Sequence, residues 1–403
     1  MKIRRNSPVF VLTVAFAIAA LPITTHGQTA ADPEIIVIGE VQGAANTVAA
    51  FLEHLDLIDS EHHWSGGDTI LIQTGDLIDD GEHVRAALDL FMGLQEEAAA
   101  AGGRVIVLMG NHEALNILGE LRDVNPMAYQ SFAGPDSENR QHRAWEDWST
   151  WSARRAEAVG ETTEVDAGAE EAWYAAHPPG WVEYVESMGP DGVYGAWLRS
   201  LPVAVEINDV LFVHGGVHRE IEDREVASIN RRAVDEIKSF DGHKAFMVAE
   251  GLCLPNSSAG EMVNVINQEA AYLNSLDDSE RTPSNPRVAR LLEIYDLSQW
   301  KSWSMLDSKG PLCFRGAARW PEEEHGPEMA AILEAFDVER MVTGQSDGRN
   351  RLIQARFDDR VLLTSIDMTD DPEGRGGDPA ALEIVGGDYF VVTMHGRDLL
   401  IDN

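Results

Sequence analysis

Apolar and polar positions near the N-terminus alternate in blocks that predict strands and helices in turn. Three apolar runs, at residues 34–38, 69–73 and 105–108, predict buried strands. Between them, apolar positions with helical spacing predict amphipathic helices over residues 44–57 and 84–101. This order of strands and helices predicts a largely parallel, buried sheet whose polar loops gather at one edge.

The middle of the chain loses this strand pattern in two places. Residues 121–201 and 220–308 carry helical patterns, and we interpret them as helical insertions. The first insertion is rich in Trp, which we expect to pack it against the main body. Between the insertions, residues 203–207 and 210–213 predict a hairpin around the turn Asn208-Asp209.

The last part of the chain returns to short apolar runs. Strands are predicted over residues 340–343, 352–357, 361–366, 382–385 and 389–393. Together with the earlier elements, they predict one α/β domain from residue 28 to 403.

Five of the predicted strands end in polar turns that contain glycine. The turns are Gly39-Glu40-Val41-Gln42-Gly43, Gly75-Asp76-Leu77-Ile78-Asp79, Gly110-Asn111-His112-Glu113, His214-Gly215-Gly216 and Gly344-Gln345. Strands of one sheet can bring such turns together at a common edge. The turns would then supply oxygen and imidazole donors to a metal centre.

With these turns in view, the chain resembles the calcineurin-like metallophosphoesterases of the phosphoprotein-phosphatase type, nearest to the bacterial Shewanella-like phosphatases. The stretch from Asn111-His112-Glu113 through Asn116 to Gly119-Glu120-Leu121-Arg122 supports that branch, as does the stretch from Gly310-Pro311-Leu312 to Phe314-Arg315-Gly316. The resemblance spans roughly residues 34 to 386. It implies two packed mixed β-sheets flanked by helices, with the helical insertions as a cap.

The resemblance also implies a dinuclear metal centre with an acid beside it. Asp76 matches the aspartate that bridges two metal ions, and Asn111 and His214 match ligands of the second metal. His112 matches the general acid that protonates the leaving oxygen, and Asp79 matches the carboxylate that orients this histidine. Arg122 and Arg315 lie in stretches that would bind the substrate phosphate, a weaker assignment.

The chain departs from the family pattern at four positions of this centre. The family has an Asp where this chain has Glu40, a His at both Gln42 and Gln345, and commonly a phosphate-binding Arg at Asp80. Because an amide oxygen is a weaker ligand than imidazole for Zn, Fe or Mn, the two changes to Gln weaken the site by on the order of 10²- to 10⁴-fold if additive.

Three interpretations remain open. In the first, the protein is a phosphatase of phosphorylated peptides or small phosphomonoesters, with a metal centre retuned to Mg²⁺, Ca²⁺ or Mn²⁺ rather than Zn²⁺ or Fe. This suits the oxygen-rich donor set Glu40, Gln42, Asp76, Asn111, His214 and Gln345. In the second, it is a catalytically inactive pseudophosphatase that serves as a binding module. In the third, it is an unrelated α/β protein whose motifs arise by chance.

The charge balance narrows the range of partners. The 403 residues contain 31 Lys and Arg against 68 Asp and Glu, a formal net charge of −37. Such a surface repels phosphate backbones and anionic lipids, so we expect neither a nucleic acid partner nor stable membrane insertion.

The N-terminal residues and the two cysteines bear on export and on thiol chemistry. Basic residues at positions 2–5, an apolar run over 9–23 and small residues after it predict a secretory signal over residues 1–27. The mature protein would then be periplasmic or secreted, with an uncleaved anchor as the alternative. In an oxidising compartment Cys253 and Cys313 could form a disulfide, and two free thiols are the alternative.

Overall fold

The three N-terminal apolar runs form neighbouring parallel strands, as predicted. They are β1 (Ile35–Ile38), β2 (Ile70–Gln73) and β3 (Arg104–Val107), with β2 in the middle. The helices between them are α1 (Ala45–His54) and α2 (Val84–Ala101). The computed structural model describes residues 33–161, 166–221, 224–345, 353–366, 368 and 378–402. The predicted secretory signal and its apolar run therefore lie outside the described residues.

The first sheet continues with three antiparallel strands from the C-terminal end of the described chain. These are β9 (Ala380–Val385), β10 (Asp388–Thr393) and β11 (Gly396–Ile401), in the sheet order β11-β10-β9-β1-β2-β3. Sequence periodicity missed β11, because this edge strand is mostly exposed and Leu399 keeps 54% of its surface accessible. A strand with little burial carries no clear apolar alternation.

The second sheet is built around the predicted hairpin. Its order is β4-β5-β6-β8-β7, with β4 (Ala204–Ile207), β5 (Val210–Val213), β6 (Arg340–Thr343), β7 (Gln354–Arg356) and β8 (Val361–Leu363). Asn208 and Asp209 connect β4 to β5 with φ values of 51° and 59°, as a tight hairpin turn requires. The α/β architecture with two mixed sheets is thereby confirmed, and Leu352 of the predicted strand 352–357 lies outside the described residues.

The five polar turns do not lie on one sheet, which corrects the expectation from the sequence. Three follow β1, β2 and β3 of the first sheet, and two follow β5 and β6 of the second. A backbone hydrogen bond joins the two edges, with Met109 after β3 donating to Pro202 O before β4 at 2.8 Å, and within the second sheet Gln345 donates to His214 O at 2.8 Å. Apolar runs alone do not reveal to which sheet a strand belongs, because buried strands of either sheet have the same pattern.

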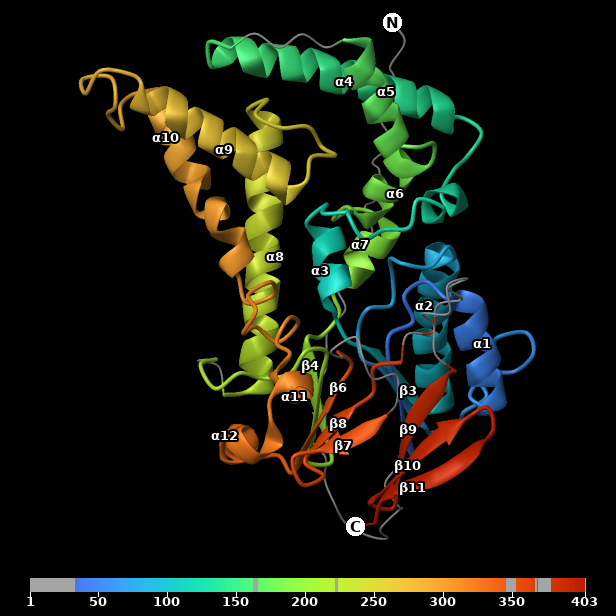
Figure 1. Cartoon of the computed structure of the whole chain (residues 1–403). Coiled ribbons are helices and arrows are strands. Elements are labelled where there is room, and N and C mark those ends of the chain that lie inside the picture. The colour runs from blue at the N-terminus through green and yellow to red at the C-terminus, as the bar shows by residue number, and fades with distance from the viewer. Residues whose placement is uncertain are drawn as a thin grey trace, which may run out of the picture. The chain divides into compact units, whose positions relative to one another are not determined.

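Helices occupy both predicted insertions (Figure 1). The first contains η1 (Ala128–Ser131), α4 (Ser137–Ala158), α5 (Ala167–Ala176), α6 (Trp181–Met188) and α7 (Val193–Leu198). Trp145, Trp173 and Trp181 of this insertion are buried in the same hydrophobic cluster as the strands of the sheets, as predicted. Trp145 also stacks on Trp148 and contacts Trp173, and Trp197 donates from Nε1 to Gln95 Oε1 of α2 at 2.7 Å.

The second insertion has a hydrophobic cluster of its own. It contains α8 (Val226–Ala249), α9 (Ala259–Asn274), α10 (Pro286–Ile294) and η2 (Tyr295–Ser302). Phe240, Met262, Ile266 and Trp300 are buried together in that cluster. Two further helices, α11 (Gly316–Arg319) and α12 (Glu322–Phe336), precede β6. No helix in the described part of the chain is long and apolar enough to span a membrane.

A buried ion-pair triad joins the two insertions. Glu269 of α9 accepts hydrogen bonds from Arg155 of α4 at 2.6 Å and from Nη2 of Arg287 of α10 at 2.9 Å. The Glu269 side chain is only 4% exposed. Burial alone would raise the pKa of Glu269, but the two guanidinium groups outweigh burial and hold the pKa below its ordinary value of 4.5.

Substituting Glu269→Gln should destabilise the protein by about 3 kcal/mol at neutral pH, because it leaves two buried guanidinium groups without their carboxylate. The pKa of Glu269 is lowered in the folded state, so its stabilisation is present above pH 4.5 and is lost as the pH falls below 4.5. Urea unfolding at pH 7 and below pH 4.5 measures both effects, and the difference between variant and parent should shrink in acid.

The matched control is Asp278→Asn, which breaks an ion pair with Arg281 that is almost fully exposed on the Asp278 side. It should change the free energy of unfolding by less than about 1 kcal/mol. Equal effects of the two substitutions would contradict the structural role assigned to the buried triad.

Candidate functional site

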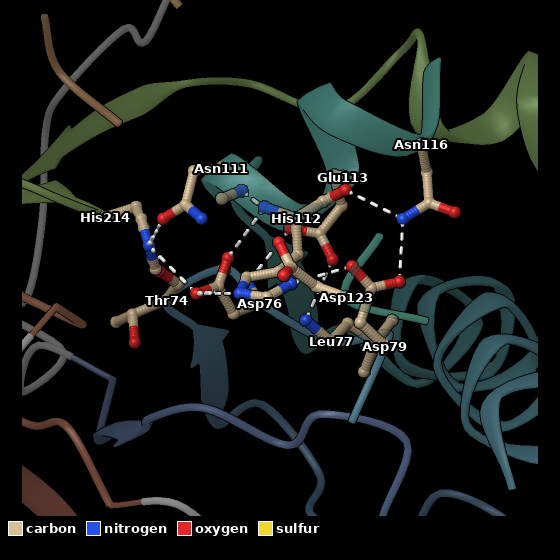
Figure 2. Close-up of polar contacts among 12 residues, drawn as sticks. Thr74, Asp76, Leu77, Asp79, Asn111, His112, Glu113, Asn116, Asp123 and His214 are labelled. Carbon is tan, nitrogen blue, oxygen red and sulfur yellow. Dashed lines mark hydrogen bonds and ion pairs between the residues drawn. The ribbon is translucent and has the colours of Figure 1, made fainter. Parts of the chain in front are cut away.

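Three side chains from three turns converge at one point between the two sheets (Figure 2). They are Asp76 after β2, Asn111 after β3 and His214 after β5. His214 Nε2 lies 3.2 Å from Asp76 Oδ2 and 3.1 Å from Asn111 Oδ1. Asp76 is 1% exposed and His214 is fully buried, so these polar groups have exchanged water for one another.

Close backbone packing makes this convergence possible. Gly110 has no side chain, and a β-carbon there would lie 2.2 Å from Asp76 Oδ1. Three non-glycine residues in the adjoining turns have positive φ: Gln42 at 47°, Asp76 at 55° and Asp79 at 94°. Such conformations cost of order 1–3 kcal/mol each and commonly cluster at functional sites.

Glu113 connects two of the turns by accepting three backbone hydrogen bonds. Its carboxylate receives the N–H groups of Gly110 at 2.7 Å, Asp76 at 2.9 Å and Leu77 at 2.8 Å. The side chain is fully buried. Burial and the nearby charge of Asp76 raise the pKa of Glu113 to about 7, against the opposing hydrogen bond from Gly110. The carboxylate therefore fixes the turn after β2 against the start of α3 (Asn111–Ile117).

A second chain of hydrogen bonds begins at His112 and runs into the cap. His112 Nδ1 pairs with Asp79 Oδ2 at 2.7 Å, and Asn116 donates from Nδ2 to Asp79 Oδ1 at 2.7 Å. Tyr184 of α6 donates its hydroxyl to Asn116 Oδ1 at 2.7 Å. Asp79 and Tyr184 are almost completely buried. Asp79 is thus held from both sides, and the His112 ring is oriented by Asp79.

The charges of this pair favour a protonated histidine. Burial alone would lower the pKa of His112, but Asp76 and the hydrogen-bonded Asp79 raise it to about 11. The pKa of Asp79 is raised mainly by burial. His112 Nε2 remains 3.8 Å from Asp76 Oδ2. A proton on Nε2 would therefore lie next to the centre formed by Asp76, Asn111 and His214.

His214 has the arrangement of a metal-binding imidazole. Its Nδ1 lies 2.8 Å from Thr74 O, and a donated proton there leaves Nε2 as an electron-pair donor. That lone pair then faces the oxygens of Asp76 and Asn111. Three donors face one another without repulsion only if a proton or a cation lies among them. Burial would lower the pKa of His214, yet Asp76 raises it to about 9, so the centre attracts positive charge.

Gln345 completes this corner in an unexpected orientation. The orientation of this amide is assigned from hydrogen bonding: with its nitrogen toward the centre, it donates to Asn111 Oδ1 at 2.9 Å, to His214 Nε2 at 2.9 Å and to Leu312 O at 3.1 Å. Its oxygen accepts from Nη2 of Arg315 at 2.7 Å. In this orientation the amide N–H groups, rather than the amide oxygen, point at the predicted ligands. Arg315 is thereby placed within one side chain of the centre.

The remaining predicted residues lie on neighbouring turns. Glu40 and Gln42 are each 7% exposed, and Gln42 donates its backbone N–H to Asp76 O at 2.9 Å. Gln42 Oε1 is buried without a hydrogen-bond partner in the described part of the chain. Arg122 is different, because its side chain is 70% exposed and pairs with the adjacent Asp123 at 3.1 Å.

The donor set is suited to a divalent cation. Asp76, Asn111 and His214 converge with one imidazole and otherwise oxygen donors, and Gln42 Oε1 is a buried acceptor that still needs a positive partner. Within the described ranges, no three His, Cys, Asp or Glu side chains form a metal-binding group. The centre is poor in imidazole because three of its positions carry amides instead: Asn111, Gln42 and Gln345.

Comparison with protein-family models identifies the family to which the chain belongs. The model described as calcineurin-like phosphoesterase matches residues 33–298, about two thirds of the chain. The chain belongs to the calcineurin-like phosphoesterase family. Calcineurin-like phosphoesterases generally depend on divalent metals, in agreement with the attraction of this centre for positive charge.

Two curated relatives are named as phosphatases. The chain is 25% identical to Shewanella-like protein phosphatase 1 of Plasmodium berghei over 225 residues, which cover 54% of this chain and 50% of that protein. It is 26% identical to Shewanella-like protein phosphatase 2 of Arabidopsis thaliana, covering 52% of each. The chain spans about half the length of the curated relatives it matches.

Solved structures share the fold. The cold-active protein-tyrosine phosphatase of a psychrophilic Shewanella species aligns over 92% of this chain and 80% of its own, with 20% sequence identity and a TM-score of 0.51. This likeness supports a calcineurin-like phosphoesterase fold that includes the region of the helical insertions.

Sequence reasoning did not assign roles to three residues that organise the site. Glu113 and Asn116 stood within the recognised stretch, and their spacing from Gly110 and His112 on a short helix was a usable signal. Tyr184 had no signal, because it lies 68 positions after its partner Asn116 and belongs to the cap. Cys253 and Cys313 are both free thiols in this calcineurin-like phosphoesterase, which leaves the disulfide alternative unsupported.

Substituting Glu113→Gln should destabilise the protein by about 3 kcal/mol, because the amide nitrogen cannot accept and leaves at least one buried N–H without a partner. Urea unfolding monitored by tryptophan fluorescence measures this loss. The control Glu280→Gln changes an exposed loop residue in the same way and should leave stability within about 0.5 kcal/mol. A similarly small effect of Glu113→Gln would show that the two turns do not depend on this carboxylate.

Proposed function

We propose that the protein hydrolyses phosphomonoesters, on phosphorylated peptides or small phosphorylated molecules, with a metal centre retuned to Mg²⁺, Ca²⁺ or Mn²⁺. The observation that carries the proposal is the His112–Asp79 pair at 2.7 Å beside the converging donors Asp76, Asn111 and His214. A module that only binds ligands has little need of a buried carboxylate that orients an imidazole.

The roles of the chain's own residues follow from this arrangement. Asp76, Asn111 and His214 would hold one divalent cation, and Glu40 and Gln42 would hold a second beside Asp76. Such cations polarise phosphoryl oxygens and lower the pKa of bound water. Asp79 and Asn116 fix the ring of His112 so that its Nε2 proton can be given to the leaving oxygen.

Binding of the phosphate itself would fall to arginine. Arg315 contacts Gln345, which in turn contacts the converging donors. Arg122 instead pairs with Asp123. Arg122 would have to leave the neighbouring Asp123 to bind an anion. The similar proteins are named as protein phosphatases and a protein-tyrosine phosphatase, which favours a phosphorylated peptide as substrate. Export to the periplasm or the medium remains part of the proposal.

The purified protein should turn over p-nitrophenyl phosphate when Mg²⁺, Mn²⁺ or Ca²⁺ is added, and more slowly with Zn²⁺, because oxygen donors suit the harder cations. His112→Ala should reduce kcat by about 10²- to 10⁴-fold, as expected for loss of a general acid. The control His395→Ala removes an exposed histidine from the β10–β11 turn and should leave kcat unchanged. Absence of both bound metal and turnover in the unaltered protein would refute the proposal.

One observation favours a second candidate, a catalytically inactive pseudophosphatase that acts as an exported binding module. The side-chain amide of Gln345 lies 2.9 Å from both Asn111 Oδ1 and His214 Nε2, and in the orientation assigned from hydrogen bonding its nitrogen donates to both and so takes the place of a cation there. A protein of this kind would keep the fold and the acidic character of the chain but would not hold metal.

The triple variant Glu40→Asp, Gln42→His and Gln345→His separates the two candidates. If the centre is retuned, the unaltered protein already contains metal, and the variant should gain about 10²- to 10⁴-fold in affinity for Zn²⁺. Metal analysis after dialysis measures this gain. Gln268→His, on an exposed face of α9, controls for adventitious binding by an added histidine. Metal in the triple variant together with none in the parent would favour the pseudophosphatase.

A further inference from the structure

A cleft separates the two helical insertions behind the catalytic turns. Its volume is about 910 Å³, within the range of about 300–1,000 Å³ typical of small-molecule pockets. One wall comes from α4 and α6, the opposite wall comes from α8, and α3 lies between them (Figure 1). The apolar lining includes Val182, Val185 and Met188 of α6, with Phe240 and Val248 of α8.

Three arginines on these walls already have carboxylate partners. Arg199 makes a two-pronged pair with Asp241 at 2.9 and 3.0 Å and also donates to the backbone oxygens of Met188 and Gly195. The other pairs join Arg143 to Asp136 at 2.8 Å and Arg140 to Glu186. The Arg199 guanidinium group therefore has little capacity left for a ligand, and the charges of Arg140 and Arg143 are offset by their carboxylate partners.

Lys244 is the exception on the α8 wall. It is half-buried, and no carboxylate of the described residues lies within ion-pair distance of its ammonium group. Its Nζ lies 5.7 Å from the centroid of the Phe240 ring, and the thiol of Cys253 and the more distant carboxylates of Asp241 and Glu261 also act on its charge. Burial, with a further contribution from the positive charge of Arg199, lowers the pKa of Lys244. An anion next to this amine would relieve the cost of its burial.

We propose that this cleft binds a small amphipathic monocarboxylate, whose carboxylate pairs with Lys244 and whose apolar chain lies against Val185, Met188 and Val248. The chemistry of the ligand follows from the lining, which offers one amine without an ion pair in the described residues and apolar side chains beside it. Most ligand pockets have this character, with an apolar lining and a few polar groups that fix orientation.

A single negative charge fits the cleft better than a phosphate dianion. Only one ammonium group lacks an acidic partner there, while Asp147 and Asp191 on the lining are exposed acids without an ion pair in the described part of the chain. A dianion would leave one charge uncompensated near these acids, in a protein whose formal net charge is −37. The site is thus distinct in chemistry from the phosphate site proposed at the catalytic turns.

The cleft also reaches the back of the catalytic turns. Asn116 belongs to its lining and donates to Asp79, which orients His112. A bound chain would therefore lie beside the residue that holds the acid pair. The inference does not depend on the proposed phosphatase activity, because ligand binding in the cleft is measured without turnover.

Isothermal titration of the purified protein with dodecanoate, below its micelle concentration, tests the proposal. Dodecanoate should bind one site per chain, and Lys244→Gln should weaken the binding by about ten-fold or more, because a charge-assisted hydrogen bond is lost. Lys244→Arg should restore most of the affinity. Dodecanol and dodecylammonium, which lack the carboxylate, should bind at least ten-fold more weakly than dodecanoate.

Two further variants separate the cleft from the rest of the surface. Lys238→Gln changes an exposed lysine on α8 that does not line the cleft, and it should leave dodecanoate affinity unchanged. Val185→Asp places a carboxylate on the apolar wall and should weaken binding, with circular dichroism confirming that each variant is folded. Undetectable dodecanoate binding, equal affinity in Lys244→Gln, or preference for dodecylammonium would overturn the proposal.

Discussion

The centre of this molecule depends on one buried carboxylate. Glu113 accepts three backbone N–H groups from two turns, so the turn after β2 and the start of α3 are held as one unit. Asp76, Asn111 and His112 all belong to these two turns, whose backbone Glu113 holds while Asp76 and Asn111 converge with His214. Hydrogen bonds to charged groups contribute about 1.5–3 kcal/mol each, enough to offset the positive φ at Asp76 and Asp79.

Two different polar networks adjoin this unit beside the converging donors. One prepares an acid: Tyr184, Asn116 and Asp79 hold the His112 ring in a single orientation. The other satisfies donors that a cation would otherwise use, through the amide nitrogen of Gln345, whose oxygen accepts from Arg315. Because a rotation of one amide exchanges its oxygen for its nitrogen, the balance between an open and a closed metal site rests on a small energy difference.

The two insertions are connected to one another and to the site. They are tied together by Glu269 and its two arginines, and the first is tied to α3 by the hydrogen bond from Tyr184 to Asn116. Between them they leave a cleft in which Lys244 is a positive group that forms no ion pair within the described residues, beside apolar side chains of both walls. Since the protein is strongly acidic, such a group stands out electrostatically from its surroundings.

The order of apolar runs and glycine-started turns in the sequence determined the parallel strands β1 to β3, their helices and the candidate residues from Glu40 to Gln345. Those features are local, because strand and helix periods and turn chemistry are written within a few residues. Short local patterns did not predict the exposed strand β11 or the division of the five turns between two sheets. Only the tertiary structure placed Tyr184 on Asn116, turned the Gln345 amide toward His214 and opened the cleft beside Lys244. The physical reason is that these contacts join residues far apart in sequence, and their geometry follows from packing, which no short pattern encodes.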